Sequence, residues 1–154
     1  MDSGPYALLR VNGPDQWTYD DTVTAFASGK GRFCYYVQAI ETGNPVLDAV
    51  SESNTACAVQ EEAVWIPNAF IIGGHNPVFL PVLAYVDVTT YELAIYNRWG
   101  QLIWTTNDPY KPWDGQVDGT YVPQGVYAYY CAFNNGAGKR IERRGTVTCL
   151  WGRE

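Results

Sequence analysis

Apolar and polar residues alternate at every second position in several stretches of this chain. The clearest case is RFCYYVQAIE, residues 32–41. In an extended conformation one face would carry Phe33, Tyr35, Val37 and Ala39, and the other Cys34, Tyr36, Gln38 and Ile40. A period of two is typical of a β-strand with one face toward a core. We therefore expect residues 32–41 to form a strand whose first set of side chains faces a core.

Three further strands are predicted before residue 61. They are residues 6–11 (YALLRV), 16–27 (QWTYDDTVTAFA) and 54–59 (NTACAV). Glycine and proline are spread along the whole chain and punctuate stretches of strand-forming residues, which is the pattern of an all-β protein. We expect residues 1–63 to be a partial β-sandwich module.

A second unit is predicted from residue 64 to residue 154. Its first part, residues 64–88, contains Pro67, Pro77 and Pro81, which disfavour helix locally. Residues 91–104, YELAIYNRWGQLIW, read as two strands around Gly100, because glycine tolerates the positive φ of a tight turn.

The last strands are predicted at residues 126–133 and 140–150, joined by the turn NNGAGK. No helical period of useful length is present. The fold class that follows is all-β: an immunoglobulin-like antiparallel β-sandwich, preceded by part of a second one.

Charge and hydropathy restrict the function. The formal net charge is −6, which is unfavourable for binding nucleic acid phosphates. No apolar run is long enough to span a bilayer, so we expect no membrane insertion. The first residues lack the basic and apolar regions of a secretory signal peptide, so we expect Met1 to be the start of an expressed fragment.

The four cysteines are Cys34, Cys57, Cys131 and Cys149, and their spacing does not match a zinc site. Four cysteines allow three pairings. The predicted strands favour Cys34–Cys57 and Cys131–Cys149, which implies an oxidising compartment. Four buried free thiols in a cytosolic protein are the alternative.

The sequence offers little catalytic chemistry. His75 is the single histidine, and the motifs of serine hydrolases, zinc proteases and nucleotide-binding loops are absent. Three acids of one loop, Asp108, Asp114 and Asp118, do not have the spacing of a calcium-binding EF-hand. We therefore predict no enzyme, no cofactor and no metal site, with calcium as the minor alternative.

Aromatic and basic residues suggest other surfaces. Trp and Tyr can form sugar-stacking platforms, although alternation turns most of them inward. Three tryptophans are not placed by the pattern: Trp99, Trp104 and Trp113. One basic cluster, Lys139, Arg140, Arg143 and Arg144, reads as a solvated face that guards an edge strand.

Five motifs occur in order toward the C-terminus: VWIPNAF, YELAIYNRWGQLIWTTND, WDG, VPQGVYAYY and GTVT. Together they resemble the gliding-motility-associated C-terminal domain, the type B sorting domain of the type IX secretion system in Bacteroidota. The resemblance covers about Val64 to the end. The usual NGDG-type loop is replaced by IIGGHNP. The first segment, with CYYVQAIE and SNTAC, resembles part of a fibronectin type III or immunoglobulin-like module.

The resemblance implies a non-enzymatic sorting label. The cargo would reach the periplasm, pass the outer-membrane type IX translocon with a PorP/SprF-like partner, and be found at the cell surface or in the medium. The candidate recognition residues are Arg98, Trp99, Gly100 and Asp114, of which Asp114 also reads as a turn acceptor. The rival hypothesis is a structural or adhesive sandwich module, or a glycan-binding one.

Overall fold

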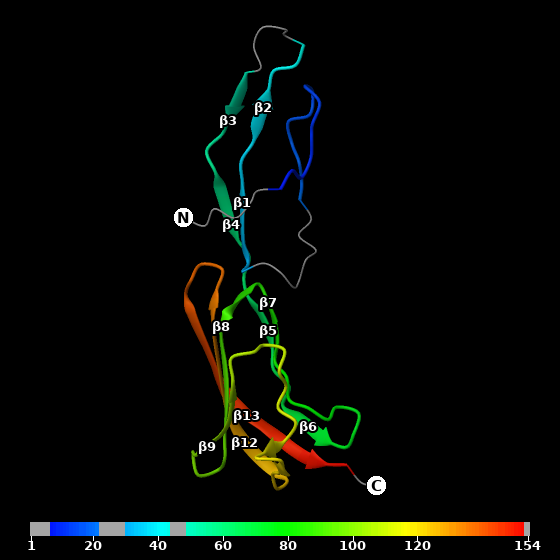
Figure 1. Ribbon diagram of the computed structural model, residues 1–154, viewed down its shortest axis with the longest axis vertical. Helices are drawn as coiled ribbons and strands as arrows, with labels where there is room; N and C mark the ends of the chain where they lie inside the picture. The colour runs from blue at the N-terminus through cyan, green and yellow to red at the C-terminus, as the bar shows by residue number, and fades with distance from the viewer. Residues whose placement is uncertain (1–6, 22–29, 44–48, 153–154) are drawn as a thin grey trace.

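The computed structural model describes residues 7–21, 30–43 and 49–152 (Figure 1). Within these ranges the chain forms strands, turns and bends but no helix. The predicted all-β class is therefore confirmed.

The C-terminal part is built on a five-stranded sheet, in the lower half of Figure 1. Its strand order is β6–β13–β12–β8–β9. The strands are β6 (Ala69–Ile72), β8 (Val86–Tyr96), β9 (Leu102–Thr106), β12 (Gly125–Asn135) and β13 (Arg140–Trp151). β6 is parallel to β13 and the other neighbours are antiparallel. The two predicted hairpins, β8–β9 and β12–β13, are confirmed.

Short pieces cover one face of this sheet. They are β5 (Ala63–Trp65) with β7 (Val82–Ala84), and β10 (Gln116–Val117) with β11 (Thr120–Tyr121). A bridge between Phe79 and Trp113 joins the two regions, and both side chains are fully buried. These pieces pack on the same hydrophobic cluster as the sheet, which makes a two-layer sandwich.

Alternation along β12 explains which face is inward. Tyr127, Cys131 and Phe133 are buried in the core, and Tyr129 packs against it. Across β8, Leu93 and Ile95 are completely buried on the same face. Burial of each such side chain contributes about 1.5–3 kcal/mol. The period of two in the sequence thus sets the sandwich interior.

The N-terminal part contains two short ladders (Figure 1). β1 (Arg32–Tyr35) pairs with β4 (Ala56–Val59), and β2 (Gln38–Ile40) pairs with β3 (Val50–Glu52). Cys34 lies directly opposite Cys57, with Cα atoms 4.0 Å apart, and the predicted disulfide between them is present. In the chain-entropy model a loop of this size adds about 3 kcal/mol.

Some N-terminal strand predictions are wrong. Residues 7–11 and 16–21 are described but form no strand, and residues 22–27 lie outside the described ranges. The expected strand over residues 32–41 is interrupted at residues 36–37. Its expected core face does not form, since Val37 is 70 % exposed. The described part of residues 7–59 has paired strands but no second layer to bury that face.

The predicted Cys131–Cys149 disulfide is also wrong, because both thiols are free and buried. In the β12–β13 ladder Cys131 lies opposite Arg143, and Cys149 lies opposite Gly125. The two cysteines are therefore six register positions apart along β12 (131 − 125 = 6), which is roughly 20 Å of strand. A disulfide needs Cα atoms within about 7 Å. Both cysteines do lie on inward positions of their strands, as the alternation predicts, but the strand register holds them too far apart to form a disulfide.

The β12–β13 loop contacts the chain that precedes β1. A Cβ at Gly136 would lie 2.5 Å from the Lys30 carbonyl oxygen. The Lys30 ammonium lies 3.1 Å from the Asp87 carboxylate. The Phe33 ring meets the Tyr85 ring edge to face at 6.5 Å. These contacts join the N-terminal ladder to one end of the sandwich.

Candidate functional site

The loop between β8 and β9 is ordered by one asparagine. The carboxamide oxygen of Asn97 accepts hydrogen bonds from the backbone N–H groups of Trp99 and Gln101, each at 3.0 Å. The backbone N–H of Asn97 donates to the Gln101 carbonyl, and that of Gly100 donates to the Asn97 carbonyl. Gly100 has a φ of 75°, which favours glycine. Asn97 and Gly100 therefore have a structural role.

The loop between β12 and β13 repeats this arrangement at the other end of the sheet. The Asn135 carboxamide oxygen accepts from the N–H groups of Ala137 and Lys139, at 3.1 and 3.0 Å. The Asn135 N–H donates to the Lys139 carbonyl, and the Gly138 N–H to the Asn135 carbonyl. Gly138 has a φ of 79°. NRWGQ and NGAGK are thus two copies of one turn.

The two copies differ at their central residues. Arg98 and Trp99 in the first correspond to Gly136 and Ala137 in the second. Since the second loop makes the same turn without them, the fold does not require a guanidinium or an indole at this position. Trp99 is 81 % exposed, and the Arg98 guanidinium lies 5.5 Å from its ring centroid. The chain therefore displays an Arg–Trp pair on a preformed turn.

The other candidates are structural. Trp113 is fully buried between Phe70 and Tyr127, each 5.3 Å away between ring centroids. The three rings come from PNAF, WDG and the GVY strand, so three of the ordered motifs meet in the core. Trp104, half-buried opposite Ile95, packs against the same core.

Asp114 is a turn acceptor. Its Oδ1 accepts the backbone N–H of Gln116 at 2.9 Å. Gly115 follows with a φ of 81°, and a Cβ there would lie 2.7 Å from Ile72 Cδ1 on β6. β6 and β9 are opposite edges of the sheet. The structure therefore does not bring Asp114 to the Arg98–Trp99 pair.

Three further features were missed from the sequence. A Cβ at Gly145 would lie 2.6 Å from the hydroxyl oxygen of Tyr129, whose ring lies across it from β12. The Tyr91 hydroxyl is buried beside the Cys131 thiol, and burial raises its pKa. Burial also raises the pKa of the Cys131 thiol to about 11, which disfavours the reactive thiolate at neutral pH. All three features depend on which residues face each other across neighbouring strands, and the sequence alone does not give that register.

Two members of the basic cluster, Arg140 and Arg144, form ion pairs on the outer face of the sheet. Arg140 lies 3.0 Å from Glu92, and Arg144 lies 2.9 Å from Glu142. The Arg144 guanidinium also covers the Tyr130 ring at 5.3 Å. For Arg140 and Arg144, these solvent-facing ion pairs agree with the solvated face predicted from the sequence.

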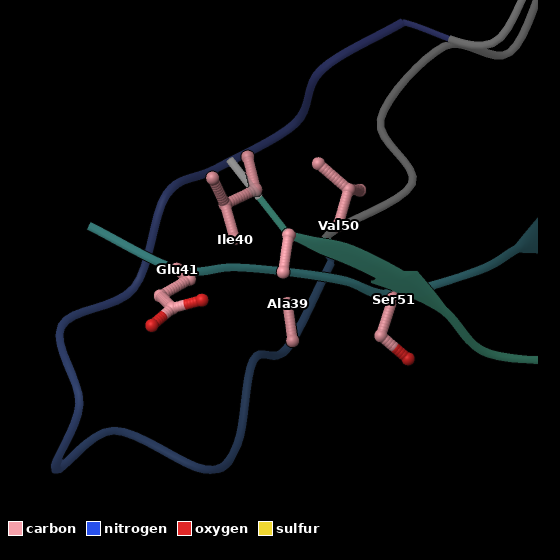
Figure 2. Close-up of a pocket in the computed structure, with 6 residues that line it drawn as sticks. Ala39, Ile40, Glu41, Val50 and Ser51 are labelled. Carbon is pink, nitrogen blue, oxygen red and sulfur yellow. The ribbon is translucent and has the colours of Figure 1, made fainter. Parts of the chain in front are cut away.

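Among the described residues no three His, Cys, Asp or Glu side chains group as metal ligands, and no helix has the length and apolar character of a membrane span. An open hollow lies beside β2 and β3 (Figure 2). There Ile40 and Val50 point to one side of the two strands, and Ala39 and Ser51 to the other. The lining is mostly aliphatic, and we assign no chemistry to it.

Comparison with known proteins identifies the family. No curated protein matches the chain. Residues 66–148, more than half of the chain, match the family model of the CHU_C type IX secretion signal domain. The match spans the entry motif, both hairpin loops and the closing strand of the sandwich. The chain therefore belongs to the family of type IX secretion signal domains, and its C-terminal sandwich is a sorting signal for export to the cell surface or beyond.

Proposed function

We propose that residues 64–154 carry a preceding cargo from the periplasm through the type IX translocon of the outer membrane, without catalysis of their own. The observation that carries the proposal is the Arg98–Trp99 pair, because it is displayed on a turn that folds without it. Residues 1–63 are a separate module of the cargo in this proposal. The receptor is an outer-membrane protein of the PorP/SprF kind.

The physical case rests on preorganisation. Exposed tryptophan and arginine side chains dominate the binding energy of many interfaces. Here Asn97 and Gly100 fix the turn, and Arg98 lies against the Trp99 ring. Because the loop is already ordered, little conformational entropy of the loop is lost when a partner binds it. The loop therefore suits recognition of a folded domain.

The test exchanges one loop for the other. A fluorescent reporter is fused between a periplasmic signal peptide and the 154-residue chain, in strains with and without a working type IX system. Arg98→Gly with Trp99→Ala converts the tip to the sequence used at residues 136–137. Loss of one hot-spot side chain costs about 2 kcal/mol of affinity, or roughly thirtyfold. Surface and medium fluorescence should fall steeply, with an unchanged melting temperature.

The matched control removes another exposed tryptophan. Trp65, on β5, is 63 % exposed, and Trp65→Ala should leave export intact. Export of the wild-type fusion in the strain that lacks the type IX system would refute the sorting route. Full export of the loop variant would refute the role of the Arg98–Trp99 pair. A glycan-binding module would instead show binding to sugars that the loop variant loses.

A further inference from the structure

The outer face of the five-stranded sheet is divided into two halves. The half nearest the β12–β13 loop has the rows Glu92–Ala132–Glu142 and Ala94–Tyr130–Arg144 across β8, β12 and β13. Its carboxylates and guanidinia are paired with one another, and Ala94 and Ala132 are buried beneath them. Charges of this kind keep an exposed sheet soluble and free of partners.

The other half has no such protection. Its outward residues are Leu102, Tyr96, Ala128 and Thr146 in one row, followed by Val126 and Thr148 in the next. We call these six residues the uncharged half-sheet. Leu102 is 50 % and Val126 is 56 % exposed. Beyond them Leu150 and Ile71, opposite each other on β13 and β6, are also exposed. In a chain of net charge −6, these adjoining outward rows hold no ionisable group except the Tyr96 phenol.

The uncharged half-sheet lies at the Arg98–Trp99 end of the sandwich. Tyr96, its member on β8, comes just before the loop. Arg98 follows Tyr96 by two residues, and it is exposed in the loop that closes this end of the sheet. None of the ion pairs found among the described residues involves Arg98. The surface therefore combines an uncharged sheet face with one cation in the loop at its end.

We propose that the uncharged half-sheet is the second half of the docking surface whose first half is the Arg98–Trp99 tip. Its occupant is a folded protein with an apolar, uncharged face and a carboxylate placed for Arg98. Charge complementarity selects this occupant over a second copy of the chain. A second copy meeting the surface with its own uncharged half-sheet would offer no carboxylate to Arg98, and two chains of charge −6 repel. This inference rests on the proposed sorting function.

The test introduces one charge into the face. Ala128 and Ala137 are both exposed alanines, the first in the uncharged half-sheet and the second in the β12–β13 loop. In the reporter fusion Ala128→Lys should lower export about tenfold or more, because a lysine buried against an apolar partner is desolvated without an ion pair. Ala137→Lys, the same substitution at the other end, should leave export unchanged. Both purified chains should keep the wild-type melting temperature.

The outcomes separate the two proposals. If the wild-type fusion is not exported by the type IX system, the sorting route fails. If the wild type is exported and Ala128→Lys is exported equally well, the route stands and the uncharged half-sheet is not a docking surface. Sedimentation of the purified chain addresses the second copy: a dimer that Ala128→Lys dissociates would overturn the proposed occupant, whereas a monomer supports it.

Discussion

The contact between Gly145 and Tyr129 gives a stability prediction whose sign depends on a neighbour. Gly145 lies in a strand and has no positive φ, so its backbone accepts alanine. However, a Cβ there would lie 2.6, 2.8 and 3.0 Å from three atoms of the Tyr129 side chain. That ring packs on Phe79 at 5.5 Å between centroids, which limits where it can move. Gly145→Ala should therefore cost about 1–3 kcal/mol, as for other overpacked sites.

The same substitution should become favourable once the ring is removed. In a Tyr129→Val background no aromatic ring opposes the new methyl group, and replacing glycine in a strand gains about 0.5–1 kcal/mol. The coupling energy between the two sites is then roughly 1.5–4 kcal/mol. Urea unfolding of the four chains, followed by the fluorescence of the buried Trp113, measures it. An equal cost of Gly145→Ala in both backgrounds would refute the argument that the ring excludes a side chain.

Two further predictions concern titratable groups. Cys131 and Cys149 should not react with a thiol reagent at pH 8 in the folded chain and should both react in denaturant, because both are buried and burial raises their pKa values; fast reaction of either in the folded chain would contradict this. The pKa of Asp87 is lowered, first by its hydrogen bond from Thr89 and also by Lys30. The ionised Asp87 therefore stabilises the fold at pH values above the pKa of an unfolded aspartate, and this contribution is lost as the pH falls through the lower pKa of the folded state. Asp87→Asn should flatten the acid limb of a curve of unfolding free energy against pH. An unchanged acid limb would contradict the assignment.

The C-terminal sandwich was largely predictable because its signals are local. The alternation along residues 126–133 and the glycine of NRWGQ specify a strand and a turn without reference to distant residues. Both hairpins were found where the pattern put them. The order of five motifs also gave the family, which the match over residues 66–148 supports.

The wrong predictions are those that depend on the register between strands or on contacts distant in the sequence. Parity placed Cys131 and Cys149 on the same inward side, and both do face the core. Whether two inward residues of adjacent strands meet depends on the offset between the strands, which the hairpin loop sets. At the N-terminus, residues 7–11 have strand-like composition but no partner strand among the described residues. Composition indicates which segments can form paired strands, whereas strand register and a second layer of structure determine which segments do.

The two equivalent loops give the sandwich a direction. β8 and β12 are antiparallel neighbours, so the loop that follows β8 and the loop that follows β12 lie at opposite ends of the sheet (Figure 1). At one end Gly136 has no room for a side chain, because the Lys30 backbone occupies it. At the other end the equivalent position is Arg98, in a loop where the next residue, Trp99, is 81 % exposed. The same type of turn therefore packs closely against the preceding chain at one end of the sheet and exposes its side chains to solvent at the other. A signal domain that is attached to its cargo at one end has the other end free for a receptor, and the distribution of side chains on the two loops matches that requirement.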